Sequence, residues 1–259
     1  MEKVLNIYKP AGMTPLEAVR AFQDKNIQYK DVKMTYAGRL DPLAEGVLLV
    51  LVGDELKKQE KYWGLDKEYE ADILLGFSTD TYDVLGMPNL KLRQTYFFGT
   101  SSTFEEVLKN FEGEYTFSLP PYSSHKIKGK PLFWWAREGR LDEIEIPQKT
   151  VNLYNIDVLS QNTLQKTELL SIILKKISSV RGDFRQDEIK KEWENQFSHL
   201  KAGETIEFKV IKIKVRCSSG TFIRSLVHDA GKKAKIGATL FHLKRTKVGN
   251  YDIKDSIKL

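Results

Sequence analysis

The sequence predicts an α+β protein built around a central, mixed and mostly antiparallel β-sheet that is flanked by helices. Strand-like and helix-like segments interleave along the 259 residues without the regular βαβ alternation that parallel sheets require. Apolar strand-like segments recur along the whole chain, and no linker-like stretch separates them. Hydrophobic residues make up 41% and charged residues 29% of the chain, as in a soluble globular protein. We therefore expect one domain, residues 1–259, with a single core.

The first part of the chain has clear element boundaries. Residues 4–8 are typical of a strand, and Thr14 and Pro15 then have the pattern of a helix N-terminus, with Glu17 in the capping-box position. Residues 47–52 form an apolar run of strand length that follows a loop and ends at glycine.

The later elements alternate between strands, short helices and polar loops. Strand patterns occur at residues 69–75, 150–159, 206–217 and 240–248, helical patterns at 56–62, 104–111 and 225–230, and a loop composition at 77–85. Two charge-rich helical segments, 165–180 and 187–200, differ from the strand-rich chain on either side. We interpret them as a helical hairpin inserted at about residues 161–201.

Composition bounds the partners and the location of the protein. Lys and Arg outnumber Asp and Glu by 41 to 35, a net charge of +6 that favours a polyanionic partner only weakly. No apolar run is long enough to span a bilayer and the N-terminus has no signal peptide, so we expect a cytoplasmic protein. Cys217 is the only cysteine, and the four histidines lack metal-ligand spacing. We therefore expect no disulfide within the chain and no metal site.

Asp41 is the first candidate for a reactive group. It lies in a loop with Gly38, Pro42 and Gly46, directly before the apolar strand at 47–52. A loop attached to a rigid strand is well suited to hold one reactive side chain. Asp-Pro in a loop is more often turn chemistry, because proline presets φ and aspartate bonds its own backbone. By itself, this segment favours the turn interpretation.

Two further residues are candidates as partners of Asp41. Arg224 follows a glycine-containing turn between a strong strand and a helix. Without context it is a surface or structural arginine, but a guanidinium beside a catalytic carboxylate would keep that carboxylate ionised and fix its direction. Tyr69 begins a strand, where an aromatic is most often a core residue. Its alternative role is to stack on a nucleobase, a contact worth about 1–3 kcal/mol.

A basic segment rich in aromatic residues occupies about residues 117–140. Its cations are Lys126, Lys128, Lys130 and Arg137, and they alternate with tyrosine, phenylalanine and two tryptophans. Lysines neutralise phosphates and aromatics stack on bases, a combination that suits looped or single-stranded RNA. A solvated basic loop with its aromatics docked on the core accounts for the composition equally well.

Other catalytic classes have little support. The sequence contains no GxxxxGK[ST] phosphate loop, no GxSxG elbow and no GxGxxG after a strand, so a dinucleotide cofactor is not expected. Paired carboxylates for glycoside hydrolysis stay open, because such partners can be far apart in sequence. From the residues alone, the chain is an α+β protein with one candidate aspartate and a feature suited to RNA.

Six segments, in order along the chain, resemble the motifs of the TruB family of pseudouridine synthases. Residues 5–14 resemble the opening KPxGxTS segment, and residues 38–48 resemble GTLDPxAxGVL, which carries the family's catalytic aspartate. The other four matches are residues 67–83 with KxYxAxxxLGxxTDTxD, 119–129 with QxPPxYSAxKxxG, 217–226 with CSxGTYIRSL, and 243–249 with LRRTxVG. Each match alone is weak, but six in the family's order are very specific.

The resemblance implies a pseudouridine synthase fold and a tRNA pseudouridine synthase activity. Such enzymes isomerise uridine in the TΨC loop of tRNA, typically at position 55, without a cofactor and with base flipping. Asp41 would start the reaction, either by attacking C1′ or by removing a proton from C2′. Tyr69 would stack on the flipped base, Arg224 would pair with Asp41, and Leu243 would line the base pocket. The resemblance further implies that Lys9 and Pro10 pack near Tyr69 and that residues 117–140 form the thumb loop that closes on the RNA.

The chain departs from the family pattern at three places. Tyr36 stands where the family usually has a histidine associated with displacing the target base, and we expect Tyr36 to wedge or stack there. The sequence stops soon after Gly249, which leaves no room for the small C-terminal RNA-binding PUA domain of many relatives. The helical insertion lies outside the pattern, and either contacts the substrate or decorates an edge.

Two alternatives to a tRNA-modifying enzyme stay open from the sequence. One is an RNA-binding or tRNA-folding protein of the same fold with weakened catalysis, because of Tyr36. The other is pseudouridylation of another hairpin RNA. In each case we expect a monomer that acts on RNA and does not bind membranes.

Overall fold

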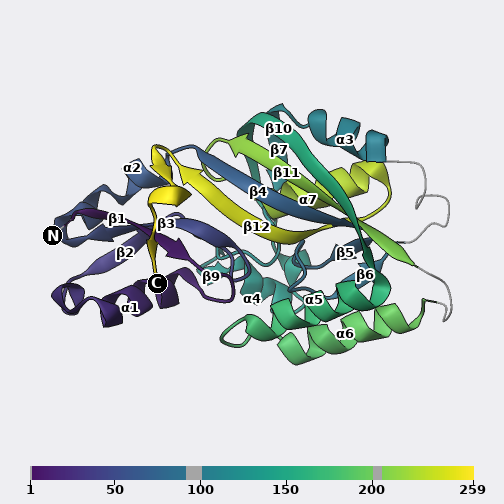
Figure 1. Cartoon of the computed structure of the whole chain (residues 1–259), viewed down its shortest axis with the longest axis horizontal. Coiled ribbons are helices and arrows are strands. Elements are labelled where there is room, and N and C mark those ends of the chain that lie inside the picture. The colour runs from purple at the N-terminus through teal and green to yellow at the C-terminus, as the bar shows by residue number, and fades with distance from the viewer. Residues whose placement is uncertain (1, 92–100, 201–205) are drawn as a thin grey trace.

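A ten-stranded sheet forms the centre of the protein and confirms the predicted α+β class (Figure 1). The structure, a computed structural model, describes residues 2–91, 101–200 and 206–259. The strand order is β14-β1-β3-β12-β4-β11-β10-β7, with β2 beside β3 and β13 beside β12. Neighbours are antiparallel except β1 with β14 and β3 with β12, so the sheet is mixed and mostly antiparallel, as expected.

The strands of this sheet and two small hairpins have the following bounds. The sheet contains β1 (Val4–Lys9), β2 (Met34–Ala37), β3 (Glu45–Val52), β4 (Lys67–Leu75), β7 (Gly113–Ser118), β10 (Gln148–Gln165), β11 (Glu207–Cys217), β12 (Ala238–Val248), β13 (Tyr251–Asp252) and β14 (Ile257–Lys258). The hairpins are β5 (Phe77–Thr79) with β6 (Pro88–Leu90), and β8 (Lys126–Ile127) with β9 (Lys130–Pro131). The loop predicted at residues 77–85 therefore begins with a short strand.

Seven α-helices lie in the described part of the chain. They are α1 (Pro15–Lys25), α2 (Gln59–Trp63), α3 (Ser101–Lys109), α4 (Leu132–Arg137), α5 (Lys166–Ser179), α6 (Gln186–Ser198) and α7 (Ile223–Ala234). Helix α1 begins with the predicted capping box, in which Thr14 and Glu17 each satisfy the other's backbone N–H. The predicted helix at 56–62 is divided between a 3₁₀ segment, Gly53–Lys58, and α2.

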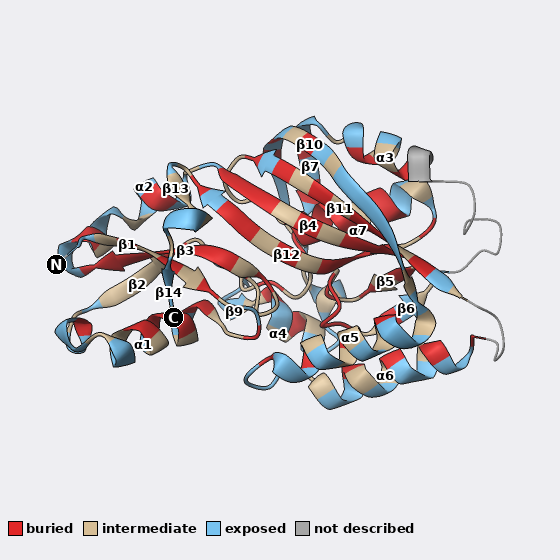
Figure 2. Ribbon diagram, viewed as in Figure 1, coloured by how far each residue is buried: buried red, intermediate tan, exposed pale blue. Residues whose placement is uncertain are grey.

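The core lies on both faces of the sheet. Every residue of β3 after Glu45 is buried, because α1 packs on one face of this half and α2 lies at the other. In the other half, α3 and α7 cover β4, β11 and β12 and form the largest apolar cluster. Figure 2 shows the resulting alternation of buried and exposed residues along the strands. The parallel contact between β3 and β12, at Gly46 and Arg245, joins the two halves beside the loop that carries Asp41.

The helical hairpin predicted from charge and periodicity is present as α5 and α6. It connects the far ends of β10 and β11, which pair as far as Gln165 and Glu207. Its apolar side chains pack on those of β5 and β11, and Phe77 contacts the rings of both Trp193 and Phe197. The Trp193 indole N–H also donates to the Val84 carbonyl at 3.2 Å. The hairpin is therefore docked on the body of the protein along its length, below the sheet in Figure 1.

Within the described ranges, no helix is long and apolar enough to cross a bilayer.

Candidate active site

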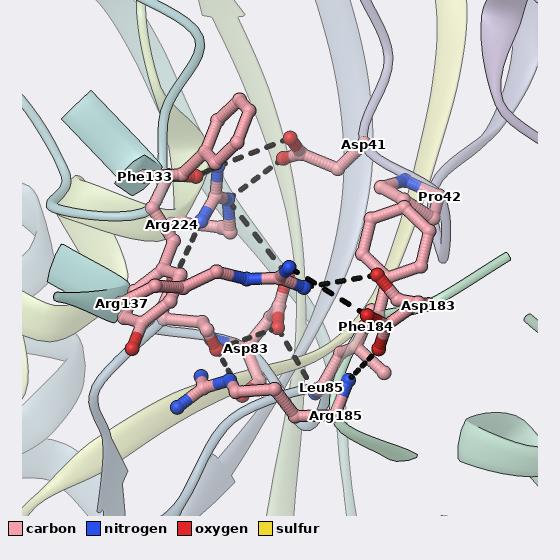
Figure 3. Close-up of a pocket in the computed structure, with 12 residues that line it drawn as sticks. Asp41, Pro42, Asp83, Leu85, Phe133, Arg137, Asp183, Phe184, Arg185 and Arg224 are labelled. Carbon is pink, nitrogen blue, oxygen red and sulfur yellow. Dashed lines mark hydrogen bonds and ion pairs between the residues drawn. The ribbon is translucent and has the colours of Figure 1, made fainter. Parts of the chain in front are cut away.

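Asp41 and Arg224 form a bidentate ion pair in the structure (Figure 3). Arg224 Nε donates to Asp41 Oδ2 at 2.7 Å, and Nη2 donates to Oδ1 at 3.0 Å. Asp41 lies in the loop between β2 and β3, and Arg224 is in the first turn of α7. The two parallel hydrogen bonds orient the carboxylate and favour its charged form. The arginine is 4% exposed and the aspartate 35% exposed, so the carboxylate is the member of the pair that solvent or a ligand reaches.

Arg224 is held by groups on two other loops. Its Nη1 donates to the Thr81 carbonyl at 2.6 Å, and its Nη2 approaches the Tyr122 carbonyl at 3.4 Å. The carboxylate of Asp83 lies 3.8 Å from Nε. A buried guanidinium is stable only when its donors are satisfied, and these partners meet that requirement. The direction of Asp41 therefore depends on four separate segments of the chain.

The backbone of the Asp41 loop is shaped from below by Lys9. Its Nζ donates to the carbonyls of Pro10, Met13 and Pro42, at 3.0, 2.6 and 3.2 Å. Gly12 N–H donates to the same Pro42 carbonyl at 2.9 Å. Burial lowers the pKa of Lys9 to about 7, and the three carbonyl acceptors match the three donors of its ammonium form. Lys9 thus positions the residue after Asp41.

Arg245 supports the same loop from the other side. It is 1% exposed and donates to the carbonyls of Gly38, Arg39 and Val47, at 3.2, 3.1 and 2.8 Å. Gly46 lies against its backbone, at φ +108°, where a Cβ would come within 2.2 Å of the Arg245 carbonyl oxygen. The sequence analysis placed Arg245 only on a strand. Its position in a segment that resembles LRRTxVG was the one available signal that it serves this loop.

Asp83 is a second carboxylate at the site that the sequence analysis did not single out. It is buried, and its Oδ1 accepts hydrogen bonds from Thr81 Oγ1 and Leu85 N–H, both at 2.9 Å. Burial raises the pKa of Asp83 to about 6, and the guanidinium of Arg224 limits that rise. The signal was its place in the segment that resembles TDTxD, although composition classified the whole stretch as a polar loop.

The raised pKa of Asp83 predicts a pH-dependent stability. An aspartate whose native pKa exceeds its unfolded value of 3.8 stabilises the fold fully below pH 3.8, and that contribution is lost as pH rises through about 6. We therefore expect the unfolding free energy of wild type, relative to Asp83→Asn, to fall by about 1.4 kcal/mol between pH 5 and pH 7. Urea unfolding of both proteins at the two pH values measures it. Asp142→Asn, which removes an exposed carboxylate, is the control, and a difference that stays constant or grows with pH contradicts the assignment.

A cavity of about 310 Å³ opens beside the Asp41–Arg224 pair. Its volume is at the small end of the range for ligand-binding pockets. The walls are formed by Asp41 and Pro42, by Thr81, Asp83 and Leu85, by Tyr122, Phe133 and Arg137, by Asp183, Phe184 and Arg185, and by Arg224. They mix apolar and aromatic surfaces with a few charged groups, as binding sites for organic ligands do.

Tyr69 and Leu243 lie on the sheet floor next to the Asp41 loop. Tyr69, at the start of β4, is 7% exposed and packs in one apolar cluster with Leu40, Ala44 and Leu243. Leu243 also lines a smaller cavity that shares Asp41 and Asp83 with the larger one. Tyr69 lines neither cavity, and a base that stacks on its ring would displace part of this packing. Pro10 contributes its carbonyl to Lys9, and both residues lie under the Asp41 loop.

The basic segment folds as the β8–β9 hairpin followed by α4. Lys128 and Gly129 both have positive φ, which is the two-residue turn that a tight hairpin favours. Lys126, Lys128 and Lys130 are exposed, and Lys130 Nζ lies 3.4 Å from the centre of the Trp134 ring. The structure therefore contains features of both interpretations: the aromatics pack around the hairpin while the lysines face solvent. Arg137 does not point outward alone, since its Nη2 donates to the Asp183 carbonyl at 2.9 Å.

Tyr36 lies away from the cavity. On β2 it faces Val50 of β3 and packs, partly buried, on the cluster formed by α1, β1 and β3. It lines neither of the two cavities that contain Asp41. The structure gives Tyr36 a packing contact at the base of the loop, and its action on a target base stays a prediction.

The inserted hairpin reaches the site, although the sequence left open whether it decorates an edge. The turn between α5 and α6 supplies Asp183, Phe184 and Arg185 to the cavity wall. Nothing in the sequence of this turn indicated such a place, because the contact joins residues about 140 positions from Asp41. Among the described residues, no cluster of three or more His, Cys, Asp or Glu side chains is arranged to hold a metal ion.

Comparison with known proteins identifies the family of this chain. The sequence model of the TruB family pseudouridylate synthase N-terminal domain matches residues 25–176. A protein of Clostridium tetani named tRNA pseudouridine synthase B is 34% identical over 263 residues, which cover all of this chain and 72% of that protein. The protein of the same name from Aquifex aeolicus is 28% identical, with the same two coverages.

Solved structures with a similar fold support the same relationship. A chain of a Cbf5-Nop10-Gar1 complex superposes with a TM-score of 0.59 at 21% identity, over 99% of this chain and 52% of that one. A chain of an H/ACA RNP bound to a substrate RNA containing 2′-deoxyuridine gives 0.56 at 20% identity, over 98% and 50%. This chain spans about half the length of those chains, and at this identity the likeness concerns the fold. Taken with the sequence matches, it leads to one conclusion: the chain belongs to the TruB family of pseudouridylate synthases.

Proposed function

We propose that the protein is a tRNA pseudouridine synthase that isomerises uridine in the TΨC loop of tRNA. The observation that carries the proposal is the oriented Asp41 carboxylate, paired with buried Arg224 and exposed to a cavity of about 310 Å³. The relatives named tRNA pseudouridine synthase B, which match the full length of this chain, support tRNA as the substrate. With such a substrate the protein acts in the cytoplasm, as a monomeric catalytic unit.

The reaction requires no net addition or loss of atoms. The N1–C1′ glycosidic bond breaks, the detached uracil turns, and its C5 bonds to C1′. The proton on C5 leaves, and N1 gains one. Asp41 begins this sequence at the ribose, by attack on C1′ or by removal of the C2′ proton. A kinetic isotope effect with 2′-deuterated uridine distinguishes the two routes, because only proton removal breaks the C2′–H bond.

The residues around Asp41 have separate roles in this proposal. Arg224 keeps the carboxylate anionic and aimed at the cavity, whereas Lys9 and Arg245 hold the loop backbone. Tyr69 and Leu243 form the apolar floor on which the uracil ring stacks. The target base must first leave its own stack at a cost of a few kcal/mol. Phosphate contacts of the thumb hairpin, through Lys126, Lys128 and Lys130, offset that cost.

Tritium release tests the proposal directly. A tRNA transcript that carries uridine labelled with tritium at C5 is expected to lose its label when wild-type protein is added, because C5 exchanges its proton for a carbon–carbon bond. Sequencing for pseudouridine in the product locates the modified position. Label release from another hairpin RNA but not from tRNA favours the different substrate, and tRNA binding without release favours the RNA-folding role.

A further inference from the structure

The turn of the inserted hairpin is tied to the catalytic loop by a continuous series of contacts. Arg181 N–H, at the end of α5, donates to the Gly12 carbonyl at 3.0 Å, and Gly12 N–H donates to the carbonyl of Pro42. Gly12 has φ +88°, and a Cβ there would lie 2.5 Å from the Ser179 carbonyl oxygen. The residue after Asp41 is therefore two hydrogen bonds away from the insertion.

The turn itself has a defined conformation. Gln186 Nε2 donates to the carbonyls of Val180 and Gly182, at 3.1 and 2.6 Å, and its Oε1 accepts from Phe184 N–H at 2.8 Å. Arg185 adopts the left-handed region at φ 62°, where non-glycine residues are uncommon. Together with the docked helices, these contacts fix the side chains of the turn relative to the cavity.

Both sides of the cavity mouth are joined to this turn. Figure 3 shows Arg137 of α4 reaching across to Asp183, with Nη1 3.8 Å from the Asp183 carboxylate. On the other side, Arg185 Nη2 donates to Asp80 Oδ2 at 2.9 Å, and its guanidinium lies 4.4 Å from the centre of the Tyr122 ring. The pair with Asp80 is 21% and 32% exposed, so solvent screens it only in part.

Tyr122 connects these contacts to the reactive pair. Its side chain lines the cavity, and its carbonyl is one of the acceptors for Arg224, which in turn orients Asp41. A guanidinium stacked on the Tyr122 ring limits the positions that both ring and backbone adopt. Arg185 is therefore placed to act on the catalytic carboxylate through Tyr122 and Arg224, without contacting it.

We propose that the turn of the inserted hairpin is part of the active site: Phe184 is the apolar wall against which the target nucleoside packs, and Arg185 is a positioning residue that holds Tyr122 at the cavity. This inference rests on the proposed function. It assigns the insertion a substrate-contacting role, which explains why the hairpin carries an ordered, charged turn at the cavity and not at an outer edge.

The Arg185 test uses a matched arginine in the same turn. Arg185→Gln and Arg181→Gln remove the same charge, but the Arg181 side chain is exposed and does not line the cavity. With enzyme in excess over tRNA and saturating, Arg185→Gln is expected to lower the single-turnover rate of pseudouridine formation about tenfold relative to Arg181→Gln. Filter binding of tRNA is expected to give equal affinities for the two variants, and melting temperatures report any loss of folding.

A double-mutant cycle separates positioning from a general structural effect. If Arg185 acts through Tyr122, Arg185→Gln costs nothing further in a Tyr122→Ala background, because the two changes break one chain of contacts. Arg185→Lys keeps the partner of Asp80 but not the planar stack, and is expected to recover only part of the rate. Additive losses overturn the positioning role.

Phe184 is tested by size. Phe184→Ala is expected to lower the single-turnover rate at least tenfold, and Phe184→Leu to restore most of it, because the wall is apolar rather than chemically specific. Equal rates for Phe184→Ala, Arg185→Gln and Arg181→Gln overturn the inference while the proposed function stands. A wild-type protein that makes no pseudouridine in tRNA or in any hairpin RNA overturns both.

Discussion

Asp41→Asn is expected to abolish pseudouridine formation while tRNA binding persists. The amide has the shape of the carboxylate but neither its charge nor its basicity, so it can neither attack C1′ nor accept the C2′ proton. Loss of an essential reactive group lowers the rate by about 10³–10⁴-fold or more. Affinity for tRNA comes mainly from phosphate contacts, which Asp41 does not make. Tritium release and filter binding, measured on the same preparations, give the two quantities.

The Asp41→Asn experiment also requires that the variant folds. The aspartate is 35% exposed, and Arg224 keeps the carbonyls of Thr81 and Tyr122 and the carboxylate of Asp83 as partners. We therefore expect a stability loss well below that of breaking a fully buried pair. Asp142→Asn serves as the control for removing one acidic group. A variant that is folded, binds tRNA and still releases tritium at a tenth of the wild-type rate would eliminate Asp41 as the reactive group.

Arg224→Met is expected to abolish activity and to destabilise the fold. The arginine is 4% exposed, and its removal leaves the buried carboxylate of Asp83 without its cation and two carbonyls without a donor. Removing one partner of a buried ion pair typically costs about 3–5 kcal/mol. Without Arg224 the pKa of Asp83 rises further, since the guanidinium is the main influence that lowers it. Urea unfolding at pH 7 measures the loss.

A second substitution tells the two effects of Arg224 apart. In Arg224→Met combined with Asp83→Asn, no uncompensated charge is buried, so a large part of the stability is expected to return. Activity is not expected to return, because Asp41 still lacks the group that orients it. Recovery of both would mean that Arg224 serves the fold alone, and recovery of neither would mean that Asp83 is not its electrostatic partner.

Local patterns predicted the elements that border the site. The apolar run after the Asp41 loop became β3, the capping box of Thr14 and Glu17 begins α1, and the two charge-rich segments became α5 and α6. Such signals are local, because strand composition, N-cap hydrogen bonds and helix periodicity depend on neighbouring residues. They account for the fold class and for the rigid mounting of Asp41.

Family motifs brought residues into view that local patterns could not. Composition placed Asp83 in a polar loop, although it is buried with a raised pKa beside Arg224. Burial of a carboxylate depends on which other loops cover it, and a sequence window contains no information about those loops. Tyr36 shows the opposite case: its motif position suggested a site residue, but the pairing of β2 with β3 turns its ring toward the α1 cluster.

By itself, the sequence determined the α+β class, the strand behind Asp41, the helical insertion and, through six ordered motifs, the family. Only the tertiary structure decided that Asp41 and Arg224 meet, 183 positions apart, and that the insertion's turn borders their cavity. The physical reason is that helix and strand formation depend on contacts a few residues apart. The cavity depends on where strand order and helix docking bring distant loops, and a single exposed turn such as residues 180–185 carries no local mark of that position.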